Sequence, residues 1–116
     1  MAIGLVRRGD ILLVDFSPAR DNEANFVRPA VVLTNNAANA NNVVISVVPL
    51  TTNLGRVYPF QLLLPYQRSG LDEDSKAQVE QLRSVALSRA LRRLGFVPDD
   101  LMALLNARVR EHLALD

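Results

Sequence analysis

The fold is decided by two short apolar runs near the N-terminus, Arg8-Gly9-Asp10-Ile11-Leu12-Leu13-Val14-Asp15-Phe16-Ser17-Pro18 and Arg28-Pro29-Ala30-Val31-Val32-Leu33. Both are rich in β-branched residues and bounded by glycine or proline, which predicts two strands. Pro18 donates nothing to a ladder and should end the first strand, whereas Pro29 holds Arg28 in extended geometry. The polar loop between them carries Arg20, Asp21, Asn22, Glu23 and Asn25. A charged loop between two buried strands is a typical place for a functional site.

The rest of the chain predicts more short strands separated by polar segments. Counting the first two, we expect strands at 11–16, 30–34, 43–48, 60–64, 77–85 and 91–94. The pattern of 77–85 also fits a helix, and 87–90 fits a turn or a short helix. The Asn-rich segment 35–42 is expected to be a turn region, and 51–59 and 65–75 are expected to be loops.

The last element has the clearest helical signature. Pro98 prevents a helix from extending upstream, and Asp99 or Asp100 is the expected cap. Apolar residues recur at helical spacing in one stripe, which we expect to pack across the sheet: Leu101, Leu104, Leu105, Val109 and Leu113. Short strands followed by one helix predict a mainly β fold with helices, a small and strongly bent barrel.

Length and composition narrow the class of protein. The 116 residues are enough for a single domain, 1–116. No apolar run of about 18 residues predicts a membrane span, and the N-terminus lacks the pattern of a signal peptide. The chain has no cysteine, which is consistent with a cytoplasmic protein. A net charge of +1 argues against nonspecific polyanion binding.

Several catalytic arrangements are excluded by residue type. The chain has one histidine, His112, so no two-histidine acid–base pair exists within it. Asp72, Glu73 and Asp74 are contiguous and more typical of a solvated loop than of a metal site. We therefore expect no metal and no cofactor. Phosphate chemistry performed by arginine and hydroxyl groups remains.

The ordered set of motifs resembles the MazF/PemK (Kid) toxins, the ribonuclease halves of bacterial toxin–antitoxin pairs. The resemblance begins in the two runs quoted above and in Glu23. It continues in Val48-Pro49-Leu50-Thr51-Thr52, Tyr58-Pro59-Phe60, Gly70-Leu71, Asp74-Ser75 and Glu80-Gln81-Leu82-Arg83-Ser84. It covers nearly the whole chain, and it implies an SH3-like barrel of the MazF/PemK/CcdB type with a C-terminal helix. It also favours a strand at 77–85.

The resemblance implies a function as well. The family's members cut single-stranded RNA without a metal, by attack of the 2′-OH, leaving a 2′,3′-cyclic phosphate and a 5′-OH. The implied partners are RNA, a second copy of the chain in a homodimer, and a cognate MazE-like antitoxin. Two alternatives stay open: a non-nucleolytic CcdB-like toxin, and a binding module of the same fold that cuts nothing.

Two residues match the family's catalytic positions. Arg28 would bind the scissile phosphate and stabilise the charge of the transition state, because a guanidinium stays protonated and is a poor base. Thr51 would hold a phosphate oxygen and orient the 2′-OH. An edge ion pair of Arg28 with Glu23 or Asp15, and a turn capped by Thr51, are the structural alternatives.

Further residues match family positions around these two. Glu23 would be a base or would orient Arg28, although a loop glutamate is usually solvated. Thr52, Phe16 and Gln81 are candidate substrate-binding residues, by a hydroxyl contact, ring stacking and reading of a base edge. For a strand phenylalanine, a place in the core is the stronger expectation.

The chain departs from the family at two glycine positions, where it has Asp21 and Phe26. Glycine adopts positive φ easily and lets RNA approach the backbone. The sequence therefore does not determine the conformation of the loop between the two runs. Phe26 is also a candidate platform for stacking a base.

Overall fold

The computed structural model describes residues 3–17, 26–41 and 43–115. Within them it contains strands β1 (Asp10–Asp15), β2 (Val27–Val32), β3 (Val44–Thr51), β4 (Leu62–Leu64), β5 (Ser75–Ala77), β6 (Arg83–Ala86) and β7 (Ala90–Phe96). The helices are α1 (Asn36–Asn41), α2 (Tyr66–Ser69) and α3 (Asp99–Leu113), and two 3₁₀ turns are η1 (Val79–Gln81) and η2 (Leu87–Arg89).

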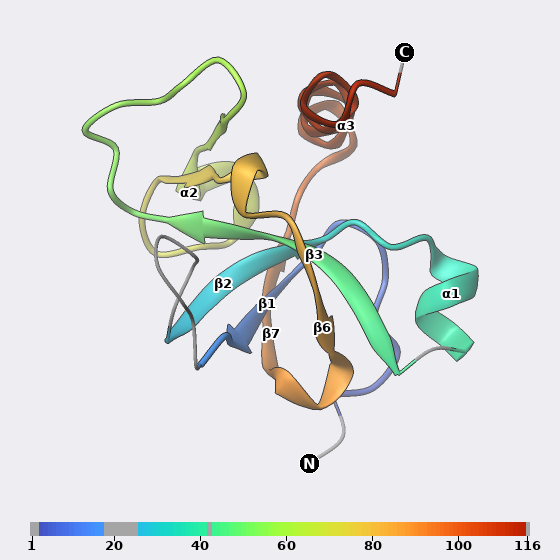
Figure 1. The fold of residues 1–116 in the computed structure, drawn as a ribbon. Coiled ribbons are helices and arrows are strands. Elements are labelled where there is room, and N and C mark those ends of the chain that lie inside the picture. Colours follow the sequence, from blue (N-terminus) through green and yellow to red (C-terminus); the bar gives the residue numbers. More distant parts are fainter. Residues whose placement is uncertain (1–2, 18–25, 42, 116) are drawn as a thin grey trace.

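The strands form one antiparallel sheet that curls into an open barrel, with α3 over one end (Figure 1). The strand order is β4-β5-β3-β2-β1-β7, and β6 also pairs with β3. The long strand β3 therefore joins the whole sheet: it pairs with β2 through Val47–Pro49, with β6 through Val44–Val47, and with β5 at Leu50 and Thr51. The expected mainly β fold with a bent barrel and a C-terminal helix is confirmed.

Alternating residues along the first strands build two apolar cores. Ile11 and Val31 face the α3 side, where they cluster with Leu101, Met102 and Leu105 of the helix. The other face carries the second cluster, which includes Leu12, Val14, Phe16, Ala30 and Val32. Since successive side chains of a strand point to opposite faces, one stretch of sequence supplies both cores.

Three segments differ from the sequence prediction. The 35–42 segment is not a turn region: it forms α1, because the Asn35 Oδ1 accepts a hydrogen bond from the Ala38 N–H (2.9 Å) and caps the helix. The expected single strand 77–85 is split into the end of β5, the η1 turn and β6. The expected loop 65–75 contains α2.

Helix α3 follows Pro98 as expected, but its first turn is built differently. Pro98 is the cap residue and no side chain caps the helix. Asp99 and Asp100 lie inside the first turn, where the helix dipole favours negative charge. The Nη2 of Arg68 on α2 donates to the Asp100 Oδ1 (2.7 Å), and this hydrogen bond lowers the pKa of the Asp100 carboxyl. The contact connects α2 to α3.

The apolar stripe of α3 is only partly in the core. Leu101 and Leu105 are buried together with Met102, which the stripe did not include. Leu104 and Leu113 are 45% and 46% exposed. No helix among the described residues has the length and apolar composition needed to cross a membrane.

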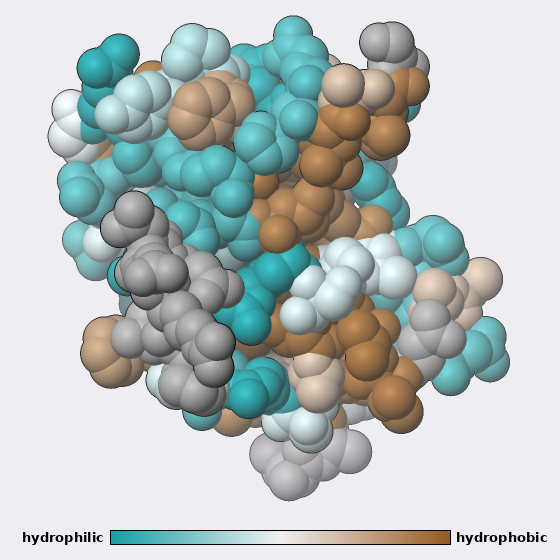
Figure 2. All heavy atoms as spheres, viewed as in Figure 1, coloured by the Kyte–Doolittle hydropathy of each residue, from teal (hydrophilic) through white to brown (hydrophobic). Residues whose placement is uncertain are grey.

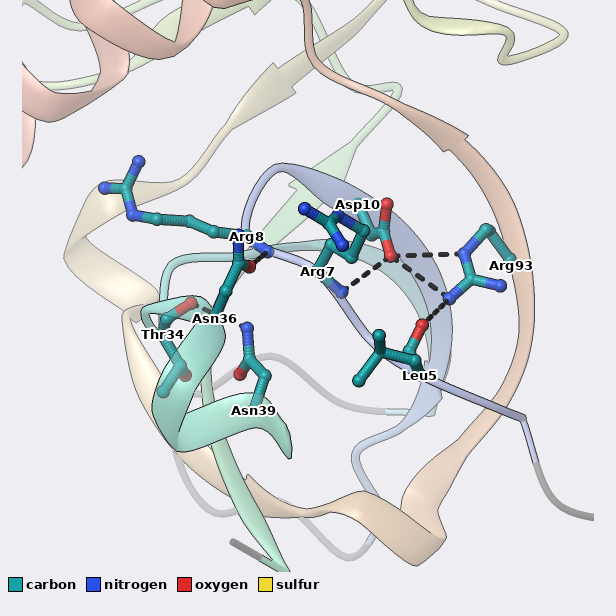
Figure 3. A network of polar contacts seen from close by, with 8 residues as sticks. All are labelled: Leu5, Arg7, Arg8, Asp10, Thr34, Asn36, Asn39 and Arg93. Carbon is teal, nitrogen blue, oxygen red and sulfur yellow. Dashed lines mark hydrogen bonds and ion pairs between the residues drawn. The ribbon is translucent and has the colours of Figure 1, made fainter. Parts of the chain in front are cut away.

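The Arg8-Gly9-Asp10 motif has a structural role (Figure 3). The Asp10 carboxylate accepts hydrogen bonds from the Arg7 N–H (2.9 Å) and from the Arg93 Nε (3.1 Å), and Arg93 also donates to the Leu5 carbonyl (2.6 Å). The Nη2 of Arg8 donates to the Asn106 Oδ1 of α3 (2.6 Å). These contacts fasten the N-terminal segment to β7 and α3.

Candidate active site

A cleft of about 420 Å³ opens where β2 and β3 lie beside the start of β5. Its walls are Phe26, Val27, Arg28, Pro29, Leu50, Thr51, Thr52 and Ser75, and we refer to it as the Arg28 cleft. Arg28 is half-buried on β2 in register with Val14 of β1. Pro29 follows it and also pairs with β1, at Leu13. The pairing of Arg28 and Pro29 with β1, together with the extended geometry that a following proline favours, sets the direction from which Arg28 enters the cleft.

Thr51 reaches the same cleft from the end of β3. It pairs in register with Lys76 of β5, and its Oγ1 accepts a hydrogen bond from the Asn53 N–H (3.2 Å). Asn53 in turn accepts one from the Gly55 N–H (3.2 Å). The threonine therefore does cap a turn, as the structural alternative stated. Because its oxygen acts as acceptor in that bond, the hydroxyl proton remains available for a phosphate oxygen.

The turn after Thr51 is held by the chain's single lysine. Lys76 is buried on β5, and its Nζ donates a hydrogen bond to the Arg56 carbonyl. The Arg56 guanidinium lies 4.5 Å from the centroid of the Tyr58 ring, and Tyr58 stacks on Phe60 with 5.3 Å between centroids. These contacts hold together the 52–60 segment, whose first residue, Thr52, lines the cleft.

Phe26 keeps the backbone conformation that the absent glycine would adopt. Its φ is +62°, in the left-handed region that bulky residues rarely occupy. Its carbonyl accepts a hydrogen bond from the Phe16 N–H (2.9 Å), and its side chain is 68% exposed at the rim of the cleft. The residue just before β2 thus has a conformation suited to glycine although it is phenylalanine.

The structure brings together three of the six predicted site residues: Arg28, Thr51 and Thr52 all line the Arg28 cleft. Phe16 does not line it. Phe16 is 1% exposed and lies in the core under the Arg83 guanidinium, the place that was the stronger expectation for a strand phenylalanine. Gln81 lies in η1 and lines neither this cleft nor the neighbouring one. Glu23 and Pro18 fall outside the described residues.

Ser75 is a lining residue that the sequence prediction missed. It is buried at the start of β5, and its hydroxyl donates to the Glu73 carbonyl (3.4 Å). The Asp74-Ser75 pair did belong to the family motifs, which was the available signal, but a lone serine after an acidic run indicates no chemistry by itself. Its position depends on the pairing of β5 with β3.

The arrangement suits an anionic substrate. One guanidinium and the hydroxyls of Thr51 and Thr52 converge on a cleft whose other walls are largely apolar. Such groups donate hydrogen bonds to phosphate oxygens and stabilise the charge that develops there. Among the residues that the structure describes, no group of three or more histidine, aspartate or glutamate side chains is close enough together to hold a metal ion.

Comparison with known proteins agrees with the fold. Residues 7–113 match the model of the family described as PemK-like, MazF-like toxin of type II toxin-antitoxin system. The chain belongs to this family. The match extends over nearly all of the residues that form the sheet and α3.

Individual relatives support the assignment. The chain is 48% identical to a protein of Mycobacterium tuberculosis named Endoribonuclease MazF9, over 96% of this chain and 98% of the relative. The crystal structure of MazF from Deinococcus radiodurans superposes with a TM-score of 0.82, at 25% identity, over 95% of this chain and 97% of that one. A mycobacterial endoribonuclease solved in complex with its cognate antitoxin has the same fold, with a TM-score of 0.76 at 18% identity over 96% and 95% of the chains.

Proposed function

We propose that this toxin is a sequence-specific endoribonuclease that cuts single-stranded RNA in the Arg28 cleft. The observation that carries the proposal is the convergence of Arg28, Thr51 and Thr52 in one cleft. The 48% identical relative is named an endoribonuclease, which supports the same activity. Single-stranded RNA suits the site because unstacked riboses and exposed base edges are needed for in-line attack and for reading a sequence.

The proposed reaction uses the substrate's own 2′-OH as nucleophile. Its oxygen attacks the adjacent phosphorus, the bond to the 5′-oxygen of the next nucleotide breaks, and the products are a 2′,3′-cyclic phosphate and a 5′-OH. Arg28 stabilises the charge on the phosphate oxygens in the transition state. Thr51 holds a nonbridging oxygen so that the 2′-OH lies in line, a proximity effect that contributes roughly 7–11 kcal/mol at its upper end.

The proton of the 2′-OH needs an acceptor, and the leaving 5′-oxygen needs a proton. We assign Glu23 as the candidate base because it matches an acidic position of the family in the loop that precedes Arg28. The guanidinium of Arg28 is the available donor to the leaving oxygen. Thr52, at the exposed rim of the cleft, is a second hydroxyl contact for the substrate. Gln81 remains a candidate for reading a base edge.

The proposed partners follow from the family. A cognate MazE-like antitoxin is expected to block the cleft, as toxin and antitoxin occur together in a related mycobacterial complex. We also propose that the toxin works as a homodimer in the cytoplasm, where its RNA substrates are. The absence of cysteine is consistent with that compartment.

The proposal is tested by mapping and characterising the cut RNA. A mixture of single-stranded cellular RNAs is incubated with the purified toxin in excess EDTA, and the new 5′ ends are sequenced. Cuts should recur at one short sequence. An oligonucleotide with that sequence should yield an upstream product one water lighter than the linear monophosphate by mass spectrometry. The same oligonucleotide with 2′-deoxyribose at the scissile position should stay intact.

Each outcome decides between defined alternatives. Cutting of the deoxy substrate, or a 3′-OH product, would make water the nucleophile and remove the proposed roles of Arg28 and Thr51. Loss of cleavage in EDTA that returns with Mg²⁺ would contradict the metal-free reaction. A toxin that arrests growth but leaves every RNA intact would support the CcdB-like alternative.

A further inference from the structure

A second cleft, of about 370 Å³, adjoins the Arg28 cleft and shares three of its walls, Pro29, Thr52 and Ser75. Its outer wall is β7, where Arg92, Arg93 and Leu94 line it, and the opposite wall is the segment after α2. We call it the Arg92 cleft. The two clefts are therefore neighbours, and a chain bound in the Arg28 cleft that continues in this direction reaches the Arg92 cleft.

The sheet register places Arg92 at a defined distance from the reacting centre. Arg92 on β7 is paired with Leu13 on β1, and Leu13 is paired with Pro29 on β2, next to Arg28. The three residues form one cross-strand row, and their side chains share one face. Two strand spacings separate Arg92 from Pro29, roughly 10 Å between backbones. Because the arginine side chain is long and flexible, its guanidinium can lie closer to the reacting centre than the β7 backbone does.

Adjacent arginines on β7 have different surroundings. Arg93 forms an ion pair with the Asp10 carboxylate and donates a hydrogen bond to the Leu5 carbonyl (Figure 3), so its positive charge is already paired within the fold. Arg92 is exposed, and within the part of the chain that the structure describes no hydrogen bond or ion pair engages its guanidinium. A guanidinium of this kind presents two parallel donors to a phosphate.

The wall opposite Arg92 carries negative charge. Asp72 and Glu73 line it, and both are exposed. Carboxylates repel phosphate, so they confine a nucleic-acid backbone to the β7 side of the cleft. They also accept hydrogen bonds from amino groups on base edges, such as the N4 amino group of cytosine. Leu13 and Leu71 supply apolar surface between the two walls.

We propose that the Arg92 cleft is a subsite for a nucleotide flanking the scissile bond, with Arg92 binding its backbone phosphate. The proposal rests on the proposed ribonuclease function and extends it to a second, non-reacting part of the RNA. Arg92 contributes to substrate binding and takes no part in bond breaking. Asp72 and Glu73 face the base of the same nucleotide.

The binding test does not depend on cleavage. The probe is a fluorescent pool of random-sequence RNA of about twelve nucleotides, within the range of single-strand binding sites, and 2′-O-methylated throughout so that it cannot be cut. Affinity is measured by anisotropy over a series of salt concentrations. Arg92→Ala should weaken binding roughly tenfold and reduce the slope of log K against log salt by about 0.7, the value for one phosphate contact on a single strand. Arg92→Lys should retain most of the slope.

The matched control is Arg7→Ala. Arg7 is an exposed arginine that lines neither cleft, so its loss removes one positive charge from the surface and should leave the slope unchanged. Equal slopes for wild type and Arg92→Ala would overturn the subsite. Equal losses for Arg92→Ala and Arg7→Ala would also overturn it, because they would reflect net charge alone.

Cleavage kinetics on the mapped oligonucleotide separate this inference from the proposed function. Arg92→Ala should raise KM and leave kcat within about twofold, since a contact made equally in the ground state and transition state affects binding only. A kcat that falls with unchanged KM would contradict a binding role. If wild type cuts no RNA, the proposed function fails, whereas the anisotropy measurement still decides whether Arg92 binds a phosphate.

Discussion

Arg28 is the residue on which the proposed chemistry depends most. Its side chain lines the cleft from the edge of β2 and is only half-buried. We expect Arg28→Ala to reduce single-turnover cleavage on the order of a hundredfold or more, because one lost donor to a developing charge costs about 3–4 kcal/mol. Arg28→Lys should recover little, since an ammonium cannot make the bidentate contact.

Thermal melting measured on the same samples separates catalysis from folding. The midpoint for Arg28→Ala should stay close to that of wild type, because Arg28 is at the border of the cleft and outside both apolar clusters. A variant that cleaves within threefold of wild type would remove Arg28 from the mechanism. A variant that melts early would return it to a structural role.

Phe26 combines an unfavourable backbone conformation with an exposed ring. A non-glycine residue in the left-handed region costs about 1–2 kcal/mol, and glycine avoids this while adding chain entropy to the unfolded state. We therefore expect Phe26→Gly to be more stable than Phe26→Ala by roughly 1 kcal/mol in chemical denaturation, because both lack the ring and only alanine retains the strained φ of +62°.

The same pair of variants tests the ring as a platform for a base. Stacking of a base on an aromatic ring is worth about 1–3 kcal/mol, so both variants should bind RNA more weakly and to a similar extent. Unchanged RNA binding in both would show that the ring does not stack on the substrate. A difference between them would assign the effect to the path of the backbone.

At the scale of elements, the wall of the Arg92 cleft depends on the close packing of α2 against β7. A Cβ added to Gly95 of β7 would lie 2.1 Å from the Ser69 carbonyl oxygen, where only backbone movement relieves the overlap. Gly95→Ala should destabilise the fold by about 1–3 kcal/mol, as expected for overpacking, and should displace the segment that carries Asp72 and Glu73. Calorimetry and the RNA anisotropy assay measure the two effects.

Gly55→Ala is the comparison variant for this prediction. Gly55 lies in the turn after Thr51, and an added Cβ would be 3.4 Å from the Asn53 Oδ1, the end of a side chain. It should cost much less stability than Gly95→Ala. Similar melting midpoints for the two variants would show that the contact between α2 and β7 is not a tight constraint.

For the whole molecule, the distribution of apolar surface bears on assembly. Apolar side chains gather over α3 and near the start of β3 (Figure 2). The exposed apolar residues of these elements include Leu104 and Leu113 of α3, Val44 at the start of β3, and Val43 just before it. Apolar patches that stay open in a single chain are typical of interaction surfaces. We expect light scattering at micromolar concentration to give twice the chain mass. A monomer that still cleaves RNA would show that one chain forms the complete site.

Much of the architecture was determined by the sequence alone. The β-branched runs predicted β1 and β2, and the spacing after Pro98 predicted α3, because strand and helix periods are local properties of the chain. The second strand was predicted at 30–34 but runs over Val27–Val32, with Arg28 and Pro29 inside it and paired with β1. Local patterns failed where capping contacts decided the outcome: Asn35 caps α1 in a segment that its composition predicts to be a turn region. The order of the motifs also indicated the toxin family.

Only the tertiary structure decided which side chains meet. Arg28, Thr51 and Ser75 come from three separate strands, and they share a cleft because β3 pairs with β2 through Val47–Pro49 and with β5 at its end. Arg92 and Arg93 are neighbours in sequence with the same chemistry and both line the Arg92 cleft, yet Arg93 is paired with Asp10 whereas no ion pair among the described residues engages Arg92. The pairing register and the bend of the sheet determine which of these side chains lie close together. Both depend on contacts between distant parts of the chain, which no local pattern contains.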